Sequence, residues 1–185
     1  AAGTSIVRVA LAGVTLTIST GGVDIVNVTA AQGAFLITDA GIAGTLTVTG
    51  MTLTIPGLVT SGISLDQVSI DFNLTPAPVN ETFAVPVDGA ITTIDLDLPA
   101  GKYFQVTVLG LSADLVDLGG LSISGDFSIT QSTNADGSTV TALGIANFTA
   151  SIESISVTNG EGAFVITSNG IAGIVSGEGL VKINI

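Results

Sequence analysis

The chain of 185 residues is acidic and poor in charge, with 15 Asp and Glu against 3 Lys and Arg and a net charge of -12 at pH 7. So few cations exclude a nucleic-acid-binding surface, because affinity for phosphates comes largely from Lys and Arg. Cys, His and Trp are absent, which excludes disulfides and thiolate sites. Only 10% of residues are charged and mean hydropathy is +0.76, whereas a soluble domain usually has about 25% charged residues. We therefore expect sheets that are covered on both faces or buried by neighbours.

Apolar residues alternate with polar residues along most of the chain, which predicts strands joined by turns about every 8–12 residues. Residues 75–87 contain three prolines and predict an irregular connection, while Gly44 or Gly50, and also Gly125, predict bends or bulges. The expected strands before the final segment are residues 6–18 (a strand pair), 23–29, 33–38, 42–55 (another pair), 65–74, 91–98, 103–109, 111–118 and 121–130.

No stretch has the apolar spacing of an amphipathic helix, and no apolar run reaches the roughly 18 residues that a membrane-spanning helix needs. Short turns favour antiparallel neighbours over parallel crossovers. The sequence therefore predicts an all-β fold, mostly antiparallel, arranged as a sandwich-like or solenoid-like stack of short strands. It predicts no membrane span.

An internal repeat organises the chain. Residues 33–44 read GAFLITDAGIAG and residues 162–173 read GAFVITSNGIAG, so the two segments differ at three positions and need no gap. Weaker matches on both sides extend the copies to residues 1–55 and 135–185, with residues 56–134 as an intervening β segment of the same domain. We expect either part of a longer periodic array or a subunit whose period a neighbour completes.

Three motifs follow one another in the second half of the chain. Residues 98–109 read LPAGKYFQVTVL, residues 121–130 read LSISGDFSIT, and residues 157–173 read VTNGEGAFVITSNGIAG. They resemble the degenerate tandem β-repeats of very large secreted bacterial surface proteins of the adhesin type, in which PxGxYxxV, LxGxF and GxGAFxxTxxGxAG recur. The resemblance covers roughly residues 95–185 and, through the internal repeat, residues 1–55. It implies a structural or adhesin-type stalk and supplies no catalytic residues.

Asp95 and Asp97 are the candidate metal ligands. Their spacing places both carboxylates on one face of the strand expected over residues 91–98, where they could bind calcium as a pair. The alternative is an exposed strand face whose charge prevents aggregation through the sheet edge. No other cofactor is expected, because Asp136-Gly137 lacks the spacing of a calcium loop and predicts a simple turn.

The residues of a catalytic site are missing. Without histidine, a nucleophilic serine would need Lys102 or Lys182 as its base, and neither lies in a recognisable motif. Glycoside hydrolysis needs two positioned carboxylates and usually aromatic side chains for the sugar, but aromatic residues make up 4% of the chain. We therefore do not expect an enzyme.

Two structural functions fit these observations. The first is an extracellular or cell-surface β-repeat protein of a bacterium that forms a stalk, fibre or matrix element with an adhesion role. No signal peptide is expected in the sequence, although Ala1-Ala2-Gly3 would suit a mature start. The second is a self-assembling filament subunit, joined noncovalently to copies of itself or to neighbouring repeats by strand complementation. The expected assembly edge is the alternating segment Leu180, Val181, Lys182, Ile183, Asn184 and Ile185.

Overall fold

The described protein is built from β-strands joined by turns and short loops. The computed structural model describes residues 5–20, 22–54, 62–115, 119–134 and 136–181. No helix within these ranges is long and apolar enough to cross a membrane. The predicted all-β class is confirmed. The strands are β1 (Ile6–Thr20), β2 (Val23–Thr38), β3 (Gly41–Leu53), β4 (Ile63–Asn73), β5 (Val79–Val87), β6 (Ala90–Leu98), β7 (Tyr103–Leu115), β8 (Leu121–Thr133), β9 (Thr139–Ile152), β10 (Ile155–Thr167) and β11 (Gly170–Val181).

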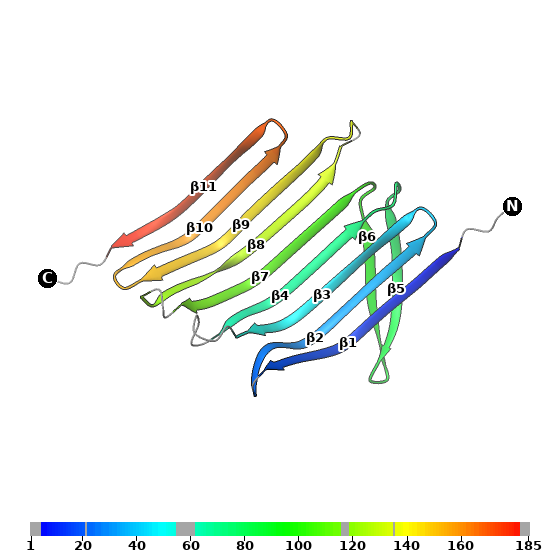
Figure 1. Ribbon diagram of the computed structural model, residues 1–185, viewed down its shortest axis with the longest axis horizontal. Coiled ribbons are helices and arrows are strands. Elements are labelled where there is room, and N and C mark those ends of the chain that lie inside the picture. The colour runs from blue at the N-terminus through cyan, green and yellow to red at the C-terminus, as the bar shows by residue number, and fades with distance from the viewer. Residues whose placement is uncertain (1–4, 21, 55–61, 116–118, 135, 182–185) are drawn as a thin grey trace.

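Nine strands form one open sheet in the order β1-β2-β3-β4-β7-β8-β9-β10-β11, and every neighbouring pair is antiparallel. Figure 1 shows this meander with β1 and β11 at its opposite edges. The two remaining strands, β5 and β6, form a separate antiparallel hairpin between β4 and β7 in the chain. The mostly antiparallel architecture is as predicted, and among the described residues a second layer exists only where this hairpin lies.

The strands are longer than the sequence predicts, because several segments that were expected to be separate strands are continuous. The expected pair over residues 6–18 is the single strand β1, in which Gly13 has a φ of 68°. A glycine with positive φ allows a bulge without a turn. The expected pair over residues 42–55 is likewise one strand, β3. Two further predictions merge in the same way: residues 23–29 with 33–38 in β2, and residues 103–109 with 111–118 in β7, of which residues 116–118 lie outside the described part.

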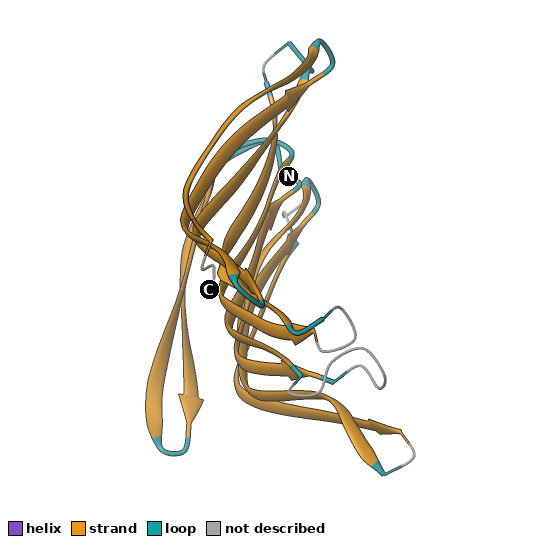
Figure 2. Cartoon of the chain, turned by 90° about the vertical axis from the view of Figure 1, so that its left-hand side faces the viewer, coloured by secondary structure: helices purple, strands orange, loops and turns teal. Residues whose placement is uncertain are grey.

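A row of bulges crosses the sheet and bends it. The strand register shifts beside Gly13 in β1, Gly110 in β7 and Asn147 in β9. Gly13 and Asn147 are equivalent when residues 14–18 are aligned with residues 148–152, and both have positive φ, 68° and 53°. Because a bulge increases the local twist and bends its strand, the sheet is strongly curved in side view (Figure 2). Two of these three bulges therefore lie at a position that the repeat copies share, and Gly110 continues the row between the copies.

The β5–β6 hairpin forms a second layer over one face of β1–β4 (Figures 1 and 2). The prediction of an irregular connection over residues 75–87 is wrong for its second part, which is strand β5. Pro86 is tolerated there because β5 pairs only with β6 and is an edge strand. The core between hairpin and sheet consists of Val79, Phe83, Ile94, Leu96 and Leu98 from the hairpin and Ala34, Leu36 and Ala43 from β2 and β3.

Asn73, the last residue of β4, fixes the root of the hairpin. Its side chain is fully buried. The Nδ2 group donates hydrogen bonds to the carbonyl oxygens of Ala77 and Pro99, at 2.9 and 2.7 Å, and Oδ1 accepts one from the N–H of Thr75 at 2.8 Å. Ala77 precedes β5 and Pro99 follows β6, so one amide holds both ends of the hairpin to the sheet.

Candidate functional site

The two repeat copies form equivalent three-strand meanders at opposite edges of the sheet. Copy 1 comprises β1, β2 and β3, and copy 2 comprises β9, β10 and β11. Their last turns contain the same hydrogen bond, donated by the Thr38 hydroxyl to the Gly41 carbonyl and by the Thr167 hydroxyl to the Gly170 carbonyl. We call the side of the sheet that carries β5–β6 the hairpin face and the other side the opposite face.

On the hairpin face of copy 1 the repeat residues are buried. Ala34, Leu36 and Ala43 are 0%, 7% and 0% exposed beneath the hairpin. At the edge strand, the Arg8 guanidinium contacts the Glu81 carboxylate of β5 at 3.0 Å, in an ion pair open to solvent. Small sheet residues therefore form a floor, and larger hairpin residues fill the space above it.

On the hairpin face of copy 2 the equivalent residues have no cover in the described structure. Ala163, Val165 and Ala172 occupy the positions of Ala34, Leu36 and Ala43 and are all exposed, Val165 by 44%. Ala142 and Gly144 of β9 pair with Val165 and Ala163, and Ile174 of β11 pairs with Ala163. The exposed patch of copy 2 is defined by these residues: Ala142, Gly144, Ala163, Val165, Ala172 and Ile174.

Between the two copies the hairpin face is polar. Thr45 donates a hydrogen bond to the Asp71 carboxylate, the Tyr103 hydroxyl donates to Gln105, and Gln105 donates to Thr107 at 3.3 Å. Burial, and then the negative charge of Asp71, raise the pKa of the Tyr103 hydroxyl above its ordinary value. The patch of copy 2 is therefore separated by β4, β7 and β8 from the covered core of copy 1.

The opposite face of the sheet is apolar across all nine strands. No described strand covers it, because the hairpin contacts the other face of β1–β4. Exposed side chains on it include Ile129 at 44% and Val175 at 68%. One unbroken row of paired residues runs from edge to edge: Leu11, Gly33, Leu46, Ile70, Val106, Ile129, Leu143, Phe164 and Gly173.

Phenylalanine packs over glycine at the same place in both copies, on the opposite face. Phe35 pairs with Gly44 and Phe164 with Gly173, and a Cβ on either glycine would collide with the ring. In copy 1 the far side of Gly44 is filled by Phe72 of β4, whose ring centroid lies 6.2 Å from that of Phe35. In copy 2 Gly173 lies on the edge strand β11, so no described strand lies on its far side.

Strands β1 and β11 are the edges of the sheet, with 15 and 12 residues. Within the described ranges each pairs on one side only, and because eight antiparallel steps separate them they run in the same direction (Figure 1). The predicted assembly edge begins at the end of β11, where Leu180 pairs with Ser156 and is 54% exposed. Val181 is the last residue of β11, and Lys182, Ile183, Asn184 and Ile185 lie outside the described residues.

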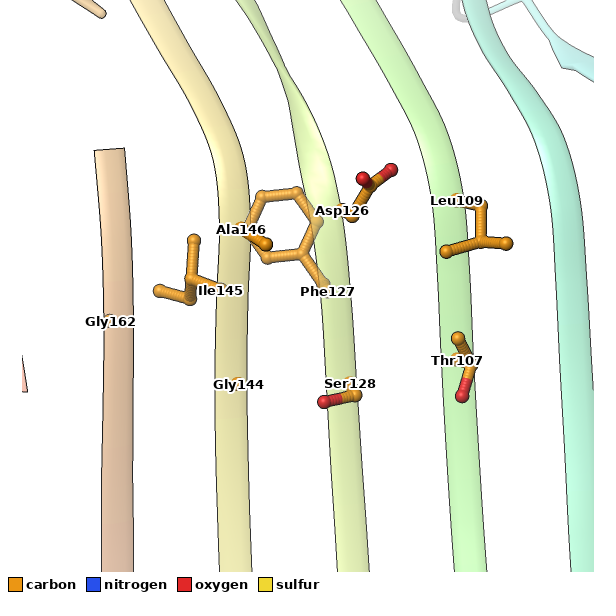
Figure 3. Close-up of a pocket in the computed structure, with 9 residues that line it drawn as sticks. All are labelled: Thr107, Leu109, Asp126, Phe127, Ser128, Gly144, Ile145, Ala146 and Gly162. Carbon is orange, nitrogen blue, oxygen red and sulfur yellow. The ribbon is translucent and has the colours of Figure 1, made fainter. Parts of the chain in front are cut away.

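A shallow hollow of about 310 Å³ lies over β7–β10 and is lined partly by Leu109, Phe127 and Asp126 (Figure 3). The Asp126 carboxylate accepts hydrogen bonds from the N–H of Gly110 at 2.8 Å and from Nδ2 of Asn147 at 2.7 Å. These bonds, the one from Gly110 foremost, hold the pKa of Asp126 below its ordinary value of 3.8. Asp126 thus ties together the bulges of β7 and β9, which is a structural task.

Asp95 and Asp97 lie on the outer side of the hairpin, and both are exposed. Asp95 accepts a hydrogen bond from the Thr82 hydroxyl at 2.8 Å, and Asp97 accepts one from Asn80 at 3.5 Å. Among the described residues no third acidic side chain joins them to make a metal-binding group. Calcium binding by this pair stays a prediction.

The chain was compared with known protein families, curated proteins and solved structures. No protein-family model, curated protein or solved structure matches the chain. The resemblance to adhesin-type repeats therefore stays a prediction, and the two faces and two edges of the sheet are the features that bear on function.

Sequence reasoning missed the layer over copy 1. The signal was present, because Ile94, Leu96 and Leu98 alternate with Asp95 and Asp97 along β6, the pattern of a strand with one buried face. Periodicity does not say which surface buries that face. The connection from β4 decides it, and this connection lies in the proline-containing segment that was expected to be irregular.

Proposed function

We propose that the protein is structural: a section of an extended β-sheet that forms a stalk, fibre or matrix element outside a bacterial cell, with an adhesion role. The observation that carries the proposal is the apolar opposite face, which crosses all nine strands. Strands lie about 4.8 Å apart, so this face is about 40 Å wide. Exposed apolar surface of this extent normally marks a site of contact with other protein.

Stacking of two such faces would form a sandwich between molecules. Sheets pack about 10 Å apart with their side chains interdigitated. A face about 40 Å wide and about five residues, or 17 Å, high buries about 700 Å² on each partner, which is close to the roughly 800 Å² of a standard interface. The low content of charged residues, 10% of the chain, fits a surface that is mostly buried in an assembly.

The proposed place outside the cell rests on composition and on the resemblance to adhesin-type repeats. Sequences rich in Thr, Ser, Gly and Val with little Lys are common among secreted bacterial surface proteins, and this chain has only 3 Lys and Arg. The proposed adhesion role follows from the resemblance alone. The apolar opposite face supports the proposal that the protein assembles with other molecules.

A second candidate is a noncovalent filament joined through the sheet edges. The long edges of β1 and β11, which have no partner strand on their outer side within the described structure, favour it, because such edges pair readily with other strands. Pairing of β11 with β1 of the next molecule in an unbroken sheet would be parallel, since the two run in the same direction. Alternating two-fold contacts, β1 with β1 and β11 with β11, would be antiparallel and slightly more stable per residue.

The test combines sedimentation with negative-stain electron microscopy, in millimolar calcium and in chelator. We expect assemblies that dissociate in Ile129→Asp, which places a charge on the opposite face, and persist in Thr130→Asp, which places it on the hairpin face of the same strand. Circular dichroism checks that both variants keep their strands. Monomers at every concentration, or equal behaviour of the two variants, would contradict assembly through this face. Assembly that requires calcium would support the Asp95–Asp97 site, and indifference to chelator would count against it.

A further inference from the structure

We propose that copy 2 is a docking site for a strand-plus-hairpin segment of another polypeptide, with the chemistry of β4–β6 of this chain. The strand of that segment pairs with β11, and its hairpin covers the exposed patch of copy 2. The inference rests on the proposed structural function for the setting in which two chains meet.

The first support is the match between the two floors. Ala34 and Ala43, buried under the hairpin in copy 1, have identical counterparts in copy 2, and Leu36 is replaced by Val165, one methylene smaller. The cross-strand pairs are also equivalent, Leu36 with Ala43 and Val165 with Ala172. Copy 2 therefore presents nearly the surface that receives a hairpin in copy 1.

The second support is the volume of the side chains. It favours a hairpin as the occupant over the same patch of a second molecule. The floor of copy 2 is largely alanine and glycine, and in copy 1 the large side chains of the core, apart from Leu36, come from the hairpin. Two facing floors of small residues would leave a gap, whereas protein cores pack at a density of about 0.74. The occupant must therefore carry large apolar residues at alternate positions, as Phe83 and Leu96 do here.

The third support is the open side of β11. In copy 1 the corresponding strand, β3, pairs with β4, and Phe72 of β4 fills the far side of Gly44. Gly173 has Phe164 on one side only, and its other side faces the edge. A β4-type strand beside β11 would pair antiparallel, place an aromatic ring next to Gly173, and deliver its hairpin onto the patch.

Charge distinguishes the two docking sites. In copy 1 Arg8, paired with Leu36, forms an ion pair with Glu81 of the hairpin. In copy 2 the residue paired with Val165 is Ala142, so the patch has no charge at this point. Docking on copy 2 is therefore apolar in character, and we expect its affinity to change little with salt.

Thiol labelling tests the proposal, because the native chain contains no cysteine. Leu36→Cys reports a covered site, Val165→Cys the patch, and Ile166→Cys the opposite face of the same strand. In the chain alone at low concentration, we expect Leu36→Cys to react at least about tenfold more slowly than Val165→Cys, since a covered thiol reacts only after local opening. The probe is a synthetic peptide of residues 63–101, which spans β4–β6. At saturation it should slow Val165→Cys by about tenfold or more and leave Ile166→Cys unchanged.

Peptide variants show whether protection depends on the packing face. A peptide with Phe83→Asp and Leu96→Asp should give no protection, and one with the outward change Thr82→Lys should protect fully. A lone hairpin is only marginally stable in water, so the peptide alone could fail to fold. We therefore also test an extended chain, in which residues 54–101 are repeated directly after residue 182, the position at which the repeat spacing places them. In that chain Val165→Cys should be protected without any peptide.

Val165→Cys that stays reactive in the extended chain overturns the proposal. Protection that rises with the concentration of the unextended chain, without peptide, also overturns it. In that chain β4–β6 is already engaged with copy 1, so a different surface of a second molecule would then be the cover. Concentration-dependent protection of Ile166→Cys instead reports stacking through the opposite face. Its absence counts against the proposed assembly and leaves the docking result intact.

Discussion

Copy 1 and copy 2 share their core sequence, strand pairing and last turn, yet one is buried and the other exposed. Leu36 is 7% exposed beneath β5–β6, and its counterpart Val165 is 44% exposed. The difference comes from residues outside the repeat, because Asn73 ties down a hairpin that only copy 1 receives within the described structure. The repeat therefore encodes one half of a packed interface, and what covers it decides whether that half is core or surface.

The largest expected difference between the copies comes from trimming equivalent residues. Leu36→Ala should lower the free energy of unfolding by about 2–5 kcal/mol, because it removes buried methylenes and leaves a cavity. Val165→Ala should change it by no more than about 0.5 kcal/mol, as at an exposed site. Urea denaturation measures both, and equal losses would mean that copy 2 is covered in solution as well.

Loss of the hairpin root should make copy 1 resemble copy 2. Asn73→Ala removes the donor to the carbonyls of Ala77 and Pro99 and leaves the N–H of the buried Thr75 without its acceptor. An unsatisfied buried group costs about 1–3 kcal/mol. We expect lower stability and faster labelling of a cysteine at position 36. Asn80→Ala is the matched control, since Asn80 is exposed and its side-chain hydrogen bond, to Asp97, is long at 3.5 Å. If position 36 stays protected in Asn73→Ala, the amide is not what holds the hairpin.

Acid should weaken the bulge row that bends the sheet. The pKa of Asp126 is lower in the folded protein than its ordinary 3.8, first through the Gly110 N–H and then through Asn147. A lowered pKa stabilises the fold at pH values above 3.8, and this contribution disappears as pH falls below 3.8 through the folded value. Urea midpoints measured from pH 6 to pH 2 should fall less steeply for Asp126→Asn than for the native chain.

Part of the acid sensitivity should remain in that variant. The pKa of Asp136 is also lowered, by the Ser138 hydroxyl and then the Ser138 N–H in the β8–β9 loop. Asp136→Asn should remove this second part, and the double variant should show the flattest profile. Identical slopes for the native chain and the Asp126 variant would show that the bridge between bulges does not contribute.

The smallest effect is expected at the ion pair that distinguishes the edges of the two copies. Arg8→Gln removes the contact with Glu81, a pair that is largely open to solvent. Exposed pairs contribute about 0–1 kcal/mol and are screened by salt. The loss should vanish in high salt, and a loss that persists there would mean that the aliphatic part of Arg8 packs on the hairpin.

The strands and the repeat could be read from the sequence because they depend on local alternation. The alternation of Val68, Ile70 and Phe72 with polar residues marks β4, and the bulge expected at Gly125 is confirmed by a register shift between Ser124 and Asp126. The pair of strands expected over residues 6–18 is the single strand β1, because a glycine such as Gly13 does not by itself distinguish a turn from a bulge. The partner strand decides this, and it is distant in sequence.

The layer over copy 1 could not be predicted because it depends on the path between β4 and β5. When only the neighbouring residues are considered, Pro86 indicates the end of a strand, yet proline is acceptable on an edge strand. The role of Asn73 was hidden for the same reason, since Ala77 and Pro99 meet only in the folded chain. The polar stretch between the covered core of copy 1 and the exposed patch of copy 2 could also not be predicted, because it depends on the register of β4, β7 and β8.

Hydrogen exchange of the two repeat cores tests most directly whether the cover, and not the repeat itself, decides burial. Residues 33–38 of β2 and 162–167 of β10 have nearly the same sequence, and each strand pairs antiparallel with a neighbour on both sides, so their amides share most local contributions to exchange. At low protein concentration we predict protection at least about tenfold greater in residues 33–38, because the hairpin must open before they exchange. Equal protection in the two segments would contradict the account.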